Sequence, residues 1–201
     1  MRRIVVNEGL NGLTANPQSM WPWGHLVFGY VVYSLWRRLS GNPPPTDTTA
    51  LLLAFGTQFP DLVDKPLAWT FGVIPNGRSL THSAITTTII VVTVLYVAHR
   101  SSRLSYATAF GTGYYSHLIG DALNPLLGGS LYELGFLLWP LVPAIDYGDG
   151  GFLAHFAELE LTPLFVVRIL VLAVPAALLW IADGTPGTAL LRWVRTRFIP
   201  E

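Results

Sequence analysis

The chain has 201 residues, of which 51% are hydrophobic and only 12% are charged, against about a quarter charged in a usual soluble domain. Its 12 Lys and Arg balance its 12 Asp and Glu, so it lacks the basic excess that attracts nucleic acid, and we expect no nucleic-acid partner. It contains no cysteine, which excludes disulfides and thiolate chemistry and leaves His and carboxylates as the residues able to bind a metal.

Apolar stretches follow one another along the chain, several of them near the length of about 20 residues that a membrane-spanning helix needs. They lie at roughly 23–38, 48–63, 82–99, 104–124, 134–146 and 161–183. The second and the fifth contain prolines, so either can be a re-entrant or interfacial piece. The sequence therefore predicts an all-α, polytopic membrane protein with about five to six membrane-embedded helices.

The segments between these stretches are short turns, and the chain has no internal repeat. We expect a single integral membrane domain over residues 1–201, with a motif-bearing core at 20–125 and a C-terminal helical part at 126–201. One side collects most of the cations: Arg37, Arg38, Arg100, Arg103, Arg192, Arg195 and Arg197. By the positive-inside rule this side is cytoplasmic, provided the fifth stretch does not cross, which predicts a multi-pass membrane protein.

Polar motifs stand at the other ends of the first four stretches. Trp23-Gly24-His25 opens the first, and Pro60-Asp61-Leu62-Val63-Asp64 closes the second. Arg78-Ser79-Leu80-Thr81-His82-Ser83 opens the third, and His117-Leu118-Ile119-Gly120-Asp121 closes the fourth. If the spans alternate in direction, all four motifs reach the same, extracytoplasmic, face of the membrane.

Ionisable side chains in apolar segments are costly and usually mark a functional site. The candidate metal ligands are His25, Asp61, Asp64, His82, His117 and Asp121. Imidazole and carboxylate together suit zinc first, and manganese or iron next. Six ligands exceed the needs of one catalytic zinc, so one or two divalent ions are expected.

Each part of this set also has a purely structural interpretation. His25 can be an interfacial residue at a helix start, and Asp64 can pair with Lys65 or Arg78 in a turn. His117 and Asp121 can form a hydrogen bond within one helix. His99 and His155 are predicted to be surface residues.

The four motifs together resemble the YdjM-type membrane-bound metal-dependent hydrolases, also described as LexA-binding, inner-membrane-associated hydrolases. The resemblance covers roughly residues 20–125 and implies a polytopic membrane protein with a metal-dependent hydrolase activity. Nothing in these residues explains the LexA association, and it is not extended to this chain. The family pattern has a His directly before the Arg of the third motif, where this chain has Gly77.

The favoured hypothesis is a membrane-bound hydrolase that acts on a phosphoester such as a lipid head group. Arg78 would bind the phosphate, and Asp64 or Asp121 would act as general base or orient a ligand histidine. A transporter or channel that uses the His and Asp cluster is one alternative. A non-catalytic membrane module with a structural metal is another.

Overall fold

The chain is described here by a computed structural model, which covers residues 20–145, 151, 163–189, 193 and 196–197. These residues form five α-helices, one π-helical turn and one 3-10 helix, and no strand, which confirms the all-α prediction for the described part. The elements are α1 (Pro22–Leu39), α2 (Asp47–Lys65), η1 (Pro66–Thr70), α3 (Ala84–Arg100), α4 (Leu104–Gly128), η2 (Leu131–Leu138) and α6 (Pro163–Ala182).

Local sequence signals set the ends of these helices. Thr46 and Thr49 form a reciprocal capping box at the start of α2, and the Ser83 hydroxyl accepts a hydrogen bond from Ile85 N at the start of α3. Gly129, with a positive φ of 75°, ends α4 in the left-handed conformation that glycine adopts without strain. Turn and cap residues therefore explain why the helices begin and end close to the predicted stretches.

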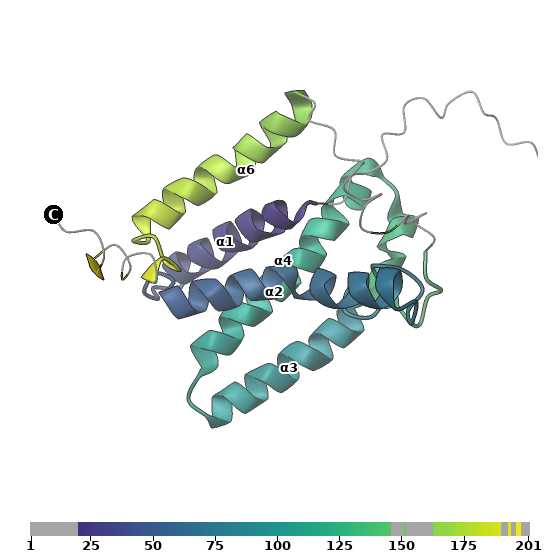
Figure 1. The fold of residues 1–201 in the computed structure, drawn as a ribbon, viewed down its shortest axis with the longest axis horizontal. Coiled ribbons are helices and arrows are strands. Elements are labelled where there is room, and N and C mark those ends of the chain that lie inside the picture. The colour runs from purple at the N-terminus through teal and green to yellow at the C-terminus, as the bar shows by residue number, and fades with distance from the viewer. Residues whose placement is uncertain (1–19, 146–150, 152–162, 190–192, 194–195, 198–201) are drawn as a thin grey trace, which may run out of the picture.

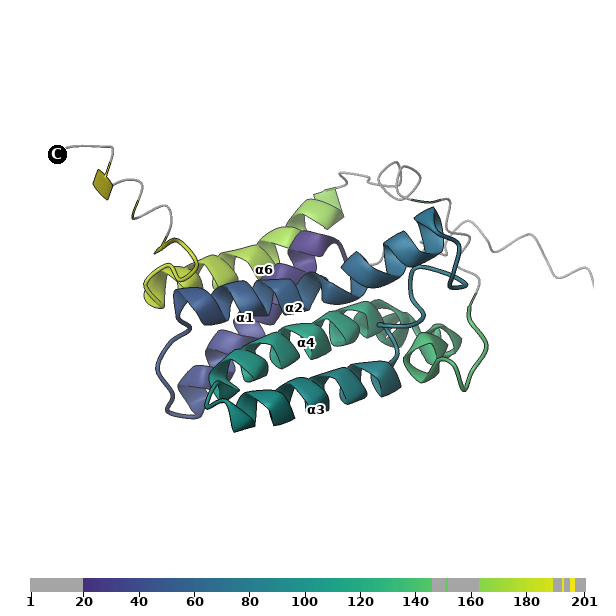
Figure 2. The same ribbon diagram turned by 60° about the horizontal axis from the view of Figure 1, so that its bottom comes forward.

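Helix α4 is the central element of the bundle. It contacts α2, α1, α3 and η2, and Figures 1 and 2 show it lying between α2 and α3. A buried cluster of Val91, Phe110, Tyr114 and Leu118 joins α3 to α4. The bundle is thus organised around the helix that also carries His117 and Asp121.

Glycines allow α2 and α4 to cross with their backbones in close contact. A Cβ on Gly56 would lie 2.3 Å from Phe110 O, and one on Gly113 would lie 2.4 Å from Leu53 O. A Cβ on Gly29 of α1 would meet the Thr57 side chain at 2.5 Å. Small residues at such crossings are typical of helices that pack without a hydrophobic driving force.

Helix α6 packs on α1, on the side away from α3 (Figures 1 and 2). The buried carboxylate of Asp183, which follows α6, accepts hydrogen bonds from Tyr30 OH at 2.8 Å and Ser34 Oγ at 2.6 Å. Arg38 forms an ion pair with the same carboxylate. This network lies toward the C-terminal end of α1, away from His25 near the start of that helix.

The fifth predicted stretch differs most from the structure. Over the described part of 134–146, the chain forms the end of the short helix η2 and then turns at residues 139–142, next to the proline at 140. Much of 126–201 lies outside the described residues, so the division into a core and a C-terminal part stays a prediction. Among the helices that the structure describes, none combines the length and the apolarity required to cross a membrane.

The α2–α4 crossing makes a first prediction. We expect Gly113→Ala to lower the free energy of unfolding by about 1–3 kcal/mol, because the added methyl group forces two backbones apart. Gly128→Ala on the same helix is the matched control, since a Cβ there meets nothing within 4 Å. Denaturant unfolding followed by circular dichroism measures both; equal stability of the two variants would show that the crossing is not tight.

Candidate metal centre

Five of the six predicted ligands meet at one end of the bundle. His25 comes from α1, Asp61 from α2, His82 from the segment before α3, and His117 and Asp121 from α4. Their ligand atoms fall into two groups in which all atoms lie within 4.8 Å of one another: Asp61 with His82 and His117, and His25 with His117 and Asp121. The two groups share His117 and therefore form one continuous cluster.

The imidazoles of His82 and His117 face each other through their Nε2 atoms, which are 3.1 Å apart. His117 Nδ1 lies 2.7 Å from the Thr57 carbonyl oxygen, and His82 Nδ1 lies 2.9 Å from Asp64 Oδ2. Both partners are acceptors, so each Nδ1 is placed to donate a proton, and each ring, when neutral, presents its Nε2 lone pair toward the other ring. Without an ion, a proton on one of the two buried Nε2 atoms bridges them in a hydrogen bond, and an ion bound by both nitrogens would take the place of that proton.

Two carboxylates extend this pair into a four-atom set. Asp61 Oδ1 lies 3.5 Å from His82 Nε2 and 3.9 Å from His117 Nε2. Asp121 Oδ2 lies 3.6 Å and 3.8 Å from the same two atoms. Ligands at typical zinc bond lengths and tetrahedral angles are about 3.3–3.6 Å apart. The donor types suit a divalent ion such as zinc; two of the five distances lie in this range, and Asp61 and Asp121 belong to different groups of mutually close atoms.

Asp64 lies on the Nδ1 side of the His82 ring, away from the facing Nε2 atoms. Its buried carboxylate also accepts hydrogen bonds from Ser79 N at 3.0 Å, Thr81 N at 2.9 Å and Thr81 Oγ at 2.7 Å. A carboxylate behind a ligand histidine orients the ring and makes it a better donor. In this arrangement Asp64 holds the segment that presents His82, and its place as a direct ligand stays a prediction.

His25 stacks on His117, with ring centroids 3.8 Å apart and an interplanar angle of 18°. Its Nε2 lies 3.3 Å from Asp121 Oδ1, whereas its buried Nδ1 has no hydrogen-bond partner among the described residues. The stacking places His25 beside the four-atom set, where it contacts the Asp121 oxygen that the other two histidines do not approach.

Two cations pair with the carboxylates that face the histidines. Arg78 Nε lies 3.2 Å from Asp121 Oδ2, and Lys65 Nζ lies 2.7 Å from Asp61 Oδ2. By sequence both cations are candidate partners of Asp64, and the structure pairs each with a different carboxylate. The motifs predict no functional role for Lys65, although its i,i+4 spacing from Asp61 indicates that the two share a helix face.

The glycine in place of the family's histidine has a structural consequence. A Cβ on Gly77 would lie 3.2 Å from Trp69 Cζ2 and 3.4 Å from Lys65 Cγ. The Trp69 ring and the Lys65 stem therefore fill the space next to this position. A Cβ at residue 77 would require the Trp69 ring to shift by a few tenths of an ångström.

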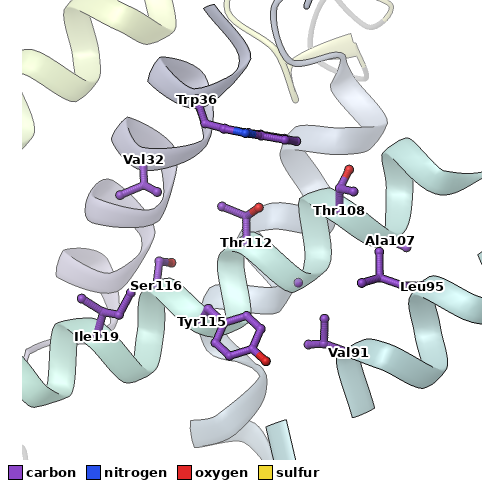
Figure 3. A pocket seen from close by; sticks show the side chains of 11 residues that line it. Val32, Trp36, Val91, Leu95, Ala107, Thr108, Thr112, Tyr115, Ser116 and Ile119 are labelled. Atoms are coloured by element: carbon purple, nitrogen blue, oxygen red, sulfur yellow. The ribbon is translucent and has the colours of Figure 1, made fainter. Parts of the chain in front are cut away.

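The remaining features lie apart from this cluster. His99 is exposed, as predicted, and His155 lies outside the described residues. A groove of about 430 Å³ runs between α1 and α3, lined by residues that include Trp36, Thr112 and Ile119 (Figure 3). None of the predicted site residues lines this groove, because His117 and Asp121 project from another face of α4.

Comparison with known proteins gives one match. A family model described as YdjM inner membrane protein matches residues 20–194, which confirms the resemblance seen in the motifs and extends it beyond residue 125. No curated protein and no solved structure matches the chain.

The position of Asp64 predicts that it affects the metal centre through His82. We expect Asp64→Asn to lower zinc affinity by about 10–100-fold, the usual cost of losing a carboxylate behind a ligand histidine. Competition with a chromophoric chelator measures the affinity. Asp47→Asn is the matched control, because Asp47 also accepts hydrogen bonds from two backbone amides, those of Gly187 and Ala189, but lies at the start of α2. A similar loss in both variants would mean that Asp64 is only a structural residue.

Proposed function

The chain belongs to the YdjM inner membrane protein family, and from this membership and the geometry of the centre we propose that it is a membrane-bound, metal-dependent hydrolase. The substrate proposed is a phosphoester such as a lipid head group, cleaved at the membrane surface. One observation carries the proposal: the buried Nε2 atoms of His82 and His117 face each other at 3.1 Å, with carboxylate oxygens of Asp61 and Asp121 beside them.

In this proposal His82, His117, Asp61 and Asp121 hold the ion, with zinc favoured over manganese or iron. A bound divalent ion supplies Lewis acidity, which activates water and neutralises charge on phosphoryl oxygens. His25 stacks on His117 and contacts Asp121, so it either steadies these ligands or contributes to a second ion.

The other residues of the cluster bind and orient. Arg78, whose side chain is 17% exposed, turns its Nε and Nη2 toward the two oxygens of Asp121, and its guanidinium has the charge and the planar set of donors that bind phosphate oxygens. Asp121 joins the two parts of the site, because one carboxylate faces both histidines and pairs with Arg78. The predicted general-base role concerns Asp64 and Asp121, whose surroundings differ: the Asp64 oxygens accept hydrogen bonds from the Ser79–His82 segment, whereas Asp121 pairs with Arg78 and is proposed to hold the ion.

Exposed apolar side chains support a place in the membrane for this bundle. Leu35 and Trp36 on α1, and Ile89, Val92 and Val97 on α3, are each more than 40% exposed. Soluble monomers rarely expose so many large apolar side chains together. With the family's description as an inner membrane protein, this supports a multi-pass protein in the cytoplasmic membrane of a prokaryote, with the lipid bilayer as its partner.

The centre lies at one end of α1 and α3, and Arg37, Arg38 and Arg100 lie at the other end. His25 is near the start of α1 and Arg37 and Arg38 are at its end, while α3 begins after His82 and ends at Arg100. The positive-inside rule then supports an extracytoplasmic position for the centre.

Metal content tests the proposal directly. We expect the purified protein to bind about one zinc ion per chain, and His82→Ala and His117→Ala to lose it, because each removes a ligand from a buried set. His99→Ala is the control, since His99 is exposed at the far end of α3. Elemental analysis of the folded proteins gives the result.

Activity is measured on the same proteins, with a panel of phosphoesters in detergent and an ion-flux assay in liposomes. Hydrolysis that depends on the metal and is absent in His82→Ala supports the proposal. Folded protein that binds no metal, or that conducts ions and hydrolyses nothing, would contradict it. A bound metal without any hydrolysis would indicate a structural metal instead.

A further inference from the structure

Lys65 is the second cation at the metal centre, and neither the motifs nor the family match assigns it a role. We propose that Lys65 binds the anionic substrate together with Arg78, and that the two cations make the loaded centre select a singly charged phosphodiester. This inference rests on the proposed metal-dependent hydrolase function and names the substrate charge that the same site accepts.

The position of Lys65 places its ammonium group at the accessible side of the cluster. The Lys65 and Arg78 side chains are 16% and 17% exposed, whereas those of His82 and His117 are fully buried and that of Asp121 is 3% exposed. A substrate that approaches the histidines from solvent therefore meets the two cations first.

The ammonium group is held in place but keeps hydrogen-bonding capacity. It donates to Asp61 Oδ2 at 2.7 Å and lies 5.7 Å from the centroid of the Trp69 ring. An ammonium has three N–H donors, and among the described residues the Asp61 carboxylate is the one acceptor it meets. The stem passes 3.4 Å from the place that a Cβ on Gly77 would occupy. A preorganised cation with donors to spare is suited to binding an anion.

The formal charges of the cluster indicate which anion the loaded centre would bind best. Asp61, Asp64 and Asp121 carry three negative charges, and Lys65 and Arg78 carry two positive charges. With neutral histidines, a divalent ion changes the balance from one net negative to one net positive charge. Buried charge is costly unless it is compensated. One negative charge, that of a phosphodiester, completes the compensation, whereas the dianion of a phosphomonoester leaves an excess.

The simpler interpretation is that Lys65 only stabilises α2, as an i,i+4 ion pair with Asp61. The two interpretations differ in what happens when the charge is removed. A helix-stabilising pair affects the folding of the chain, whereas an anion-binding cation next to a metal affects metal and anion affinity in opposite directions.

The experiment compares wild type with Lys65→Met, which keeps the length of the stem and removes the charge. Zinc affinity is measured by chelator competition, and binding of dimethyl phosphate by phosphorus NMR line broadening in the cobalt-loaded protein. We expect Lys65→Met to bind zinc about tenfold more tightly than wild type, because the variant lacks a positive charge that repels the ion. We expect dimethyl phosphate to bind the variant about tenfold more weakly than wild type, because it loses a charge-assisted hydrogen bond from Lys65.

Lys65→Arg keeps the charge and is expected to retain both wild-type affinities within about threefold. Arg100→Met is the matched control, because it removes an exposed cation at the far end of α3. Inorganic phosphate, measured beside dimethyl phosphate at a pH where it is a dianion, tests the selectivity.

The outcomes separate this inference from the proposed function. Metal uptake by wild type with unchanged zinc and dimethyl phosphate affinities in Lys65→Met overturns the inference alone. Tighter binding of the phosphate dianion than of dimethyl phosphate by wild type overturns the charge selectivity. A wild-type chain that takes up no metal overturns the proposed function and this inference with it.

Discussion

The close crossing of α2 and α4 is the constraint on which both the bundle and the candidate centre depend. Gly56 and Gly113 leave no side chain between the two backbones, so the helices meet at the separation that the peptide groups themselves set. At that separation the Thr57 carbonyl accepts a hydrogen bond from His117 Nδ1 at 2.7 Å. The bond determines which nitrogen of His117 faces the centre. One turn further along α2, Asp61 faces the same ring.

The second requirement is that buried charge must be compensated inside an apolar bundle. Asp64 is satisfied by the backbone amides of Ser79 and Thr81 and by His82, so its charge organises the segment before α3. Asp61 pairs with Lys65 through Oδ2 and directs Oδ1 at the histidines, whereas Asp121 Oδ2 both pairs with Arg78 and faces the histidines. The carboxylates thus differ in what they can do: one supports a ligand, and two are placed to bind an ion.

Several parts of the fold and the site were predictable because they depend on local sequence. Capping residues such as Thr46 and Ser83, and apolar stretches of helical length, explain why four of the predicted segments coincide with α1–α4 to within a few residues. The i,i+4 spacing of His117 and Asp121 puts both on one face of α4. The partners of Lys65 and Arg78 were not predictable, because the motifs offer three carboxylates and spacing along the chain does not choose among them. Helix packing decides that Lys65 pairs with Asp61 and Arg78 with Asp121.

The sequence by itself determined that the chain is all-helical, poor in charge and without cysteine, and that His and Asp motifs recur where alternating helices bring them to one end. These properties follow from the amino-acid composition and from the spacing of apolar stretches and motifs along the sequence, so they require no knowledge of how the helices pack. Tertiary structure decided which carboxylate lies behind His82, which two imidazoles face each other, and that Lys65 stands at the edge of the cluster. Such choices depend on the distance and rotation between helices, and the glycine crossing of α2 and α4 sets both.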